Sequence, residues 1–234
     1  DSAQPTNVDP RTRVIAIGSG KGGVGKSTLS ANIALGLAKK GFQTGLLDAD
    51  IWEFSIPRLL GITGRIEANS DKKMIPHEVG NLKVISTGLI TSDEDTALMW
   101  RGLMLSKALE QFLTDVEWGD LDYLIIDLPP GTGDIQMALI RLLPQAELIV
   151  VKTPQLMAQK VATRVADMAK RSFIPLLGVI ENMSYFETDT GEKYNIFGEG
   201  GGEALSDKFG IPLLGKVPIS ENTNNVADLS LIHI

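Results

Sequence analysis

Residues 14–28 read Val-Ile-Ala-Ile-Gly-Ser-Gly-Lys-Gly-Gly-Val-Gly-Lys-Ser-Thr, an apolar run that leads straight into a glycine-rich loop. From Gly20 to Ser27 the loop fits the pattern G-x-x-x-x-G-K-[ST] at every fixed position. Glycines let backbone N–H groups converge on phosphate oxygens, and the helix that follows points its N-terminus at the anion. The segment therefore predicts a phosphate-binding loop between a strand at Val14–Ile17 and a helix at Thr28–Lys40.

The side chains of this loop have separate expected roles. Lys26 is predicted to direct its charge toward the β- and γ-phosphates of a nucleotide, and Ser27 offers a hydroxyl to Mg²⁺. Lys21 is a second lysine that a generic loop of this kind does not need. It is either a solvated lysine or a cation that reaches phosphates, including those of a partner subunit. The predicted nucleotide contacts in the loop are Gly20, Lys21, Gly22, Gly23, Val24, Gly25, Lys26, Ser27 and Thr28.

Acidic residues follow two further apolar runs. Asp48 and Asp50 come at the end of one run, and Asp127 comes at the end of another. Carboxylates at the carboxyl ends of parallel strands lie where α/β sheets bind ligands, although an Asp at a strand end is also a common helix N-cap. Asp127 is predicted to hold Mg²⁺ through water. Gly131, just beyond it, is predicted to bring a backbone amide to the γ-phosphate and to respond to its loss.

Apolar runs alternate with helical patterns along the whole chain, which predicts an α/β fold with a mostly parallel sheet flanked by helices. The expected strands are Val14–Ile17, Thr44–Leu47, Val84–Ser86, Tyr123–Ile126, Leu148–Val151, Leu177–Ile180 and Leu213–Val217. The expected helices are Thr28–Lys40, Thr96–Leu113, Ile135–Leu142, Leu156–Arg171 and Glu203–Phe209. The glycine run 198–202 either approaches a ligand or forms the entry to the last of these helices.

Composition narrows the class of protein. The 234 residues suit one large α/β domain, and a net charge of −7 makes a nucleic-acid surface an unlikely default, so no nucleic-acid partner is expected. No run approaches the roughly 20 apolar residues that a membrane span needs, so we expect a cytoplasmic chain with no membrane partner. No cysteine occurs, which excludes disulfides and thiolate metal ligands from this chain. We expect residues 1–12 to form a disordered lead-in or linker and residues 13–234 a single domain, truncated at its carboxyl end.

Several motifs together carry a resemblance to a known family. Residues 21–28 resemble the deviant Walker A motif, with its extra lysine, of the MinD, ParA and nitrogenase-iron-protein class of ATPases, which has the SIMIBI-type P-loop NTPase fold. Within that class the chain resembles the Mrp/ApbC family of iron–sulfur cluster carrier ATPases, from about Val14 to Pro218. The segments that carry this closer resemblance are 47–51 (LDADI), 55–58 (SIPR), 127–134 (DLPPGTGD), 181–185 (ENMSY) and 198–202 (GEGGG).

The resemblance implies a dimer that binds and hydrolyses Mg-ATP, and it implies a role for particular residues. Lys21 would contact nucleotide across the dimer. Asp50 would position the attacking water and contribute to the metal site, with Asp48 in support. Asn182 would read the adenine edge. Lys26, Ser27 and Thr28 would hold phosphates and Mg²⁺, and Asp127 would be the Walker B acid. Iron–sulfur assembly or client proteins would be partners.

The chain departs from the family at one place. Many members carry a Cys-x-x-Cys pair just after the segment that matches Tyr185-Phe186, and here residues 187–192 read Glu-Thr-Asp-Thr-Gly-Glu. A [4Fe–4S] cluster is expected for the family, but cluster ligation rests mainly on thiolates, and this Cys-free chain does not support it. An alternative is a spatial organiser of the MinD or ParA type. A GTP-driven metal chaperone is disfavoured because no Asn-Lys-x-Asp tetrapeptide occurs.

Overall fold

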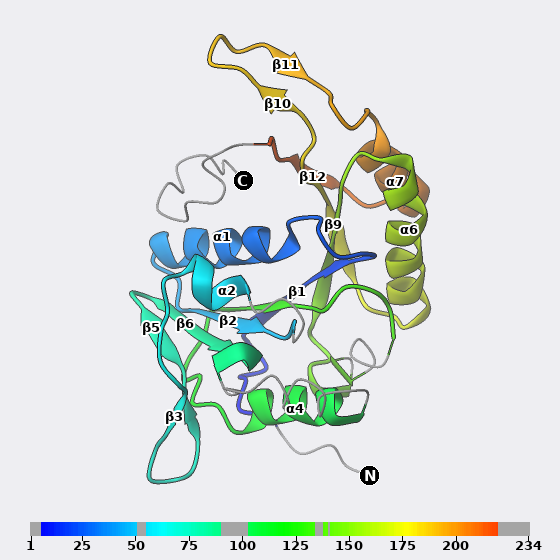
Figure 1. Ribbon diagram of the computed structural model, residues 1–234. Helices are drawn as coiled ribbons and strands as arrows, with labels where there is room; N and C mark the ends of the chain where they lie inside the picture. Colours follow the sequence, from blue (N-terminus) through cyan, green and yellow to red (C-terminus); the bar gives the residue numbers. More distant parts are fainter. Residues whose placement is uncertain (1–5, 51–54, 90–102, 134–137, 140, 220–234) are drawn as a thin grey trace.

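The computed structural model describes residues 6–50, 55–89, 103–133, 138–139 and 141–219 of the chain. Within this part an eight-stranded sheet runs through the molecule in the order β12-β9-β8-β1-β7-β2-β6-β5 (Figure 1). Its strands are β1 (Arg13–Ser19), β2 (Thr44–Asp48), β5 (His77–Val79), β6 (Leu82–Ser86), β7 (Tyr123–Asp127), β8 (Glu147–Lys152), β9 (Leu176–Glu181) and β12 (Leu213–Lys216). All neighbours are parallel except β5 and β6, which form an antiparallel pair at one edge.

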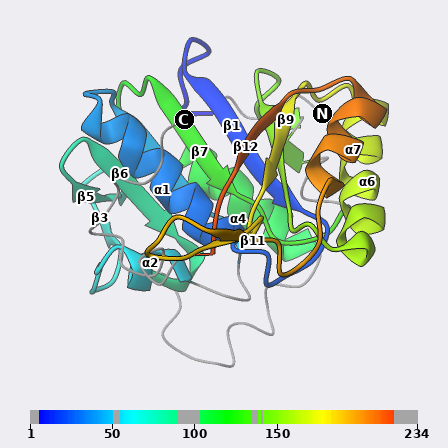
Figure 2. The ribbon, with the colours of Figure 1, turned by 90° about the horizontal axis from the view of Figure 1, so that it is seen from above.

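The strands are apolar because helices cover both faces of the sheet. Helix α1 (Lys26–Lys39) and the short α2 (Ser55–Leu59) pack on one face, where Leu29 and Ile56 are buried with alternate residues of the strands. Helices α4 (Leu103–Thr114), α6 (Leu156–Arg171) and α7 (Gly201–Phe209) contribute to the core on the other face. Figure 2 shows α1 and α6 on opposite sides of the strands.

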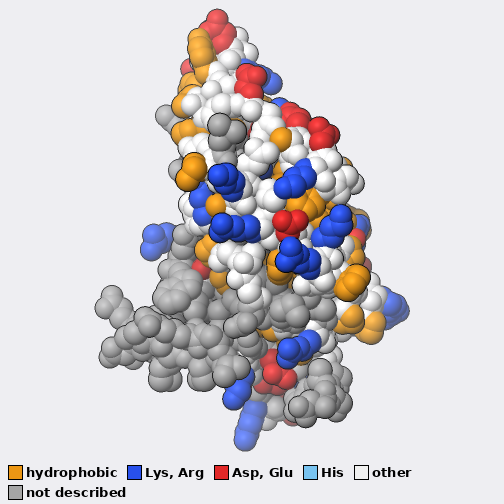
Figure 3. All heavy atoms as spheres, turned by 90° about the vertical axis from the view of Figure 1, so that its right-hand side faces the viewer, with side chains coloured by type: hydrophobic (Ala, Val, Ile, Leu, Met, Phe, Trp, Pro, Cys, Tyr) orange, Lys and Arg blue, Asp and Glu red, His pale blue; other side chains and the backbone are white. Residues whose placement is uncertain are grey.

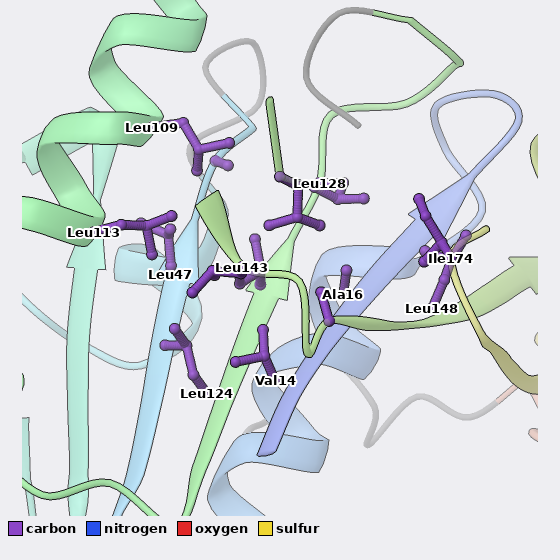
Figure 4. Close-up of a cluster of buried hydrophobic side chains, with 14 of the residues drawn as sticks. Val14, Ala16, Leu47, Leu109, Leu113, Leu124, Leu128, Leu143, Leu148 and Ile174 are labelled. Atoms are coloured by element: carbon purple, nitrogen blue, oxygen red, sulfur yellow. The ribbon is translucent and has the colours of Figure 1, made fainter. Parts of the chain in front are cut away.

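The larger core cluster fills the space between the central strands and the second set of helices. Figure 4 shows side chains of β1, β2 and β7 meeting leucines from α4 and from the segments beyond β7. Val14 and Ala16 alternate in β1 with Ile15 and Ile17, which point to the α1 face, as expected for a strand whose side chains alternate between two buried faces. This core holds the carboxyl ends of β1, β2 and β7 side by side.

Smaller elements lie outside the main sheet. Strands β3 (Glu67–Ala68) and β4 (Met74–Ile75) pair as a hairpin, and a 3-10 turn, η1, covers Thr87–Leu89. Strands β10 (Phe186–Glu187) and β11 (Lys193–Tyr194) pair as a second hairpin, which stands out from the body at the top of Figure 1. We call residues 185–200, which contain this hairpin and end where α7 begins, the arm.

The predicted α/β fold with a mostly parallel sheet is confirmed, and each expected strand lies within or close to an observed one. Helix α1 begins two residues earlier than expected, at Lys26, so this lysine belongs to the first turn. The expected helices at 96–113 and 135–142 lie partly outside the described residues. Within the expected lead-in of residues 1–12, Val8 is buried in the core and the Thr12 hydroxyl donates to the Leu121 carbonyl at 2.7 Å.

Candidate nucleotide-binding site

The glycine-rich loop joins β1 to α1 at the carboxyl edge of the sheet. Gly25 has a left-handed φ of 77°, and a Cβ on it would overlap the Asn182 side-chain amide. At Gly20 a Cβ would overlap the backbone of Val161 in α6. Both positions therefore require glycine, one for conformation and contact and the other for close approach of a helix. The sequence pattern and the packing agree at these two points.

A pocket of about 270 Å³ opens over this loop. Its lining combines the loop with residues from three other segments: Ser19, Lys21, Gly22, Gly23, Val24, Gly25, Lys26, Ser27, Thr28, Asp50, Ser55, Pro130 and Met183. Most of the predicted nucleotide contacts therefore share one concave surface at the N-terminus of α1. Such a helix end, with backbone N–H groups and a lysine, favours an anion.

Asp127 is the centre of a hydrogen-bonded cluster beneath the pocket. Its Oδ1 accepts from Lys26 Nζ at 2.7 Å and its Oδ2 accepts from Ser27 Oγ at 2.6 Å. The Ser30 hydroxyl lies 2.9 Å from both Asp127 Oδ1 and the Lys26 carbonyl, so its single proton can serve either acceptor. All four side chains are buried. A buried carboxylate is stable here because a cation and hydroxyls surround it.

Asp48 and Asp50 form the acidic side of the same cluster. Asp48 lies beside Asp127 in the register of β2 and β7, accepts the Asp50 backbone N–H at Oδ1 (3.1 Å), and accepts the Ser86 hydroxyl at Oδ2 (2.9 Å). Burial, and secondarily the charge of Asp127, raises the pKa of Asp48 to about 8. Asp50 is buried with its Oδ2 3.8 Å from Lys26 Nζ. Lys26 is therefore shared between two carboxylates, while Asp48 supports the backbone at Asp50.

Two other predicted residues touch the loop without lining the pocket. Gly131 has a φ of 103°, and its N–H donates to the Ser19 carbonyl at 2.8 Å, which ties the segment after β7 to the start of the loop. Asn182 follows β9, and its side-chain amide donates to the Val24 carbonyl at 2.8 Å. Its predicted role toward adenine stays a prediction.

Several residues of the site could not be identified from the sequence. Ser30 and Ser86 contact the carboxylates but carry no motif, and Met183 lines the pocket beside Asn182. Lys21, which the sequence left open between two interpretations, lines the pocket, and its carbonyl accepts the Ser19 hydroxyl at 3.0 Å.

Three features define this chain as a P-loop NTPase: a glycine-rich loop between the first strand and helix, a lysine and a serine that contact an aspartate at a strand end, and a mostly parallel sheet. Sequence comparison agrees: the family described as ParA, NUBPL iron-transfer P-loop NTPase, matches residues 11–232. The chain belongs to this family of iron-transfer P-loop NTPases.

Curated relatives carry the name iron-sulfur cluster carrier protein. Those from Bacillus subtilis and Mycobacterium tuberculosis are 44% and 46% identical over 92% and 93% of this chain. The chain spans 61% and 57% of their respective lengths. A relative of the same name from Pseudomonas fragi is 43% identical, and 76% of its length is covered. The resemblance to iron–sulfur cluster carrier ATPases is therefore confirmed at the level of the family.

Solved structures give the same result for the fold. A nucleotide-binding protein from Archaeoglobus fulgidus, in complex with ADP, is 36% identical and has a TM-score of 0.80 over 94% of this chain and 87% of its own. MinD from Pyrococcus horikoshii with Mg-ADP has a TM-score of 0.67 at 21% identity, covering 92% of this chain and 85% of that one, and this likeness concerns the fold alone. Within the described residues, no helix has the length and apolar character needed to cross a membrane.

Proposed function

We propose that this chain binds Mg-ATP at the pocket over residues 20–28 and hydrolyses it. The observation that carries this proposal is the cluster in which Lys26 and Ser27 both contact Asp127. Lys26 would contact the phosphates of a nucleotide and Ser27 its metal ion, and both side chains lie together at the pocket. The ADP complex of the Archaeoglobus relative supports the choice of ligand.

The residues present fit Mg²⁺. This ion usually takes one or two protein oxygen ligands and completes its shell with water and substrate phosphates. Ser27 Oγ offers an oxygen ligand at the pocket, and Asp127 stands directly behind it, with Asp50 on the pocket wall. When bound, the ion would neutralise charge on the phosphates. Among the described residues no group of three or more His, Cys, Asp or Glu side chains is placed to hold a metal ion, so the phosphates of the substrate would complete the site.

Asp50 is the residue that we assign to the attacking water. It is buried at the pocket wall, Asp48 accepts its backbone N–H, and its Oδ2 lies 3.8 Å from the Lys26 Nζ that also contacts Asp127. A carboxylate held in this way can orient a water while Lys26 turns to the phosphates. Asp48, which burial keeps protonated near neutral pH, is poorly suited to that task and serves as a support.

Lys21 supports a proposal of dimeric action. It lines the pocket and is partly exposed, while Lys26 already supplies a cation from within the subunit. A second, partly exposed lysine is available to the phosphates of a facing copy. We therefore assign ATP-dependent dimerisation to this chain and a cross-subunit contact to Lys21.

The biological role that we propose is iron–sulfur cluster assembly or transfer. The shared family and the names of the relatives support it. Residues 187–192, where many members carry cysteines, form the tip of the arm, and the Thr188 and Thr190 hydroxyls there lie 2.8 Å apart. Hydroxyls and carboxylates are poor ligands for iron–sulfide cores. In this chain the contribution to cluster chemistry would be the nucleotide-driven step, with thiolates supplied from elsewhere.

Asp50→Ala tests the function. The variant should retain Mg-ATP binding in calorimetry and lose hydrolysis, and a trapped ATP-bound dimer should appear by light scattering. Asp71→Ala, an exposed site on the β3–β4 turn, is the matched control and should hydrolyse ATP like the wild type. Hydrolysis by Asp50→Ala at the wild-type rate would remove Asp50 from the mechanism. Failure of the wild type to bind any nucleotide would remove the proposed function itself.

A further inference from the structure

The arm leaves the body at Ser184 and returns to it at the start of α7. It exposes acidic side chains and also the apolar side chains of Phe186, Tyr194 and Ile196. Acidic and apolar side chains lie at the top of Figure 3. Both ends of the arm converge on one buried carboxylate, that of Glu181 at the end of β9. Its Oε2 accepts the Ser184 hydroxyl at 2.6 Å, and its Oε1 accepts the Gly202 N–H at 2.7 Å.

Glu181 is held firmly in place. It is buried, its carbonyl accepts the Val217 N–H at 2.8 Å, and it pairs in register with Lys152 of β8, whose side chain is buried as well. The Lys152 Nζ lies so close to Gly201 that a Cβ there would overlap it. The buried Lys152 side chain, the buried Glu181 carboxylate and the glycines at the N-terminus of α7 therefore form one packed joint. Of the two interpretations of the glycine run 198–202, this packing favours the entry to a helix, because Gly201 and Gly202 begin α7.

The next residues of the chain connect this joint to the nucleotide pocket. Asn182, adjacent to Glu181, donates to the Val24 carbonyl and blocks any side chain at Gly25. Met183 lines the pocket with a left-handed φ of 53°. A non-glycine residue pays about 1–2 kcal/mol for this conformation, and it persists only where neighbours fix both sides. Here Asn182 is fixed on the phosphate loop and Ser184 on Glu181.

We propose that Glu181 is a positioning residue that ties the arm to the nucleotide pocket, so that nucleotide in the pocket restrains the arm. The inference rests on the proposed nucleotide binding and goes beyond it. A ligand on the loop fixes Val24, and through Val24 the Asn182 amide. The strained turn at Met183 then passes this restraint to Ser184 and to the carboxylate that holds both ends of the arm. Without the Ser184 hydroxyl, this end of the arm loses its bond to Glu181 and keeps its backbone bonds, Ser184 N–H to the Val217 carbonyl at 2.9 Å and Ile219 N–H to the Tyr185 carbonyl at 2.7 Å, while the pocket keeps all of its lining residues.

Hydrogen exchange of the arm with and without Mg-ADP tests this coupling. In the wild type, Mg-ADP should slow exchange of arm amides by about threefold or more, because local opening becomes less frequent. Ser184→Ala should lose this response while its affinity for Mg-ADP stays within about twofold of the wild type. Ser206→Ala, which removes a hydroxyl bond to Ile211 beyond the other end of α7, is the matched control and should keep the response.

The wild type alone also decides the question. The β3–β4 hairpin is exposed like the arm, and among the described residues its contacts run to Val116 and Glu117 rather than to the pocket. If Mg-ADP protects the arm no more than this hairpin, or if Ser184→Ala responds like the wild type, the coupling is refuted. Calorimetry on the same samples separates the two proposals: absent ADP binding refutes the nucleotide site, whereas normal binding with an unresponsive arm refutes the coupling alone.

Discussion

Asp48→Asn should change how the stability of this protein depends on pH. Asp48 has an ordinary pKa of 3.8 in the unfolded chain, and burial raises its pKa to about 8 in the folded protein. Between these values the folded protein holds a proton that the unfolded chain has released. Stability contributed by this group is therefore fully present below about pH 4 and is lost as the pH rises toward 8. One such group contributes a slope of at most about 1.4 kcal/mol per pH unit.

The asparagine variant removes this slope and keeps the local contacts. Its side chain has nearly the shape of the protonated acid, its oxygen can accept the Asp50 N–H, and its amide can donate to Ser86 Oγ. Urea unfolding without nucleotide and with a chelator, at pH 5, 6, 7 and 8, measures the difference. The stability of the wild type should fall relative to Asp48→Asn at each step. Asp71→Asn, an exposed carboxylate, controls for the change in net charge. Parallel stability curves for wild type and Asp48→Asn would refute the account of a buried, protonated Asp48.

Three further outcomes are expected. Lys26→Met leaves the Asp127 carboxylate buried with only the Ser27 and Ser30 hydroxyls, so the free energy of unfolding should fall by about 3 kcal/mol. Calorimetry should detect no tight ATP binding by this variant, and unchanged affinity would rule out the phosphate-loop assignment. Lys21→Ala should bind ATP as a monomer but fail to dimerise with ATP in light scattering, and normal dimerisation would make Lys21 a solvated lysine. Anaerobic reconstitution with iron and sulfide should leave no cluster absorbance after desalting, whereas a stable band with about two irons or more per subunit would contradict this.

The location of the site could be predicted from the sequence because parallel sheets bring strand ends together. Asp48, Asp50 and Asp127 each follow an apolar run, and the rule that ligands bind at the carboxyl edge of such sheets placed them near the loop. The structure brings them into one cluster with Lys26. The order of the strands in the sheet could not be predicted from the sequence, because a helical crossover can place a strand beside several different neighbours.

Other features could not be predicted because their partners are remote in sequence. Ser30 lies 97 positions from Asp127 and reads as an ordinary small residue of an amphipathic helix. Glu181 and Gly202 are joined across the whole arm. No strand was expected in the arm, because strands of two residues leave no alternating pattern to detect.

The joint at Glu181 also has a consequence for how the chain can vary. Because Ser184 and Gly202 are anchored to the same carboxylate, the distance between the two ends of the arm is set by the body and not by the residues at its tip. Exposed segments with fixed, neighbouring ends accept substitution and insertion without loss of the fold. We therefore expect residues 187–192 to accept substitution, including a grafted Cys-x-x-Cys sequence, without loss of the fold.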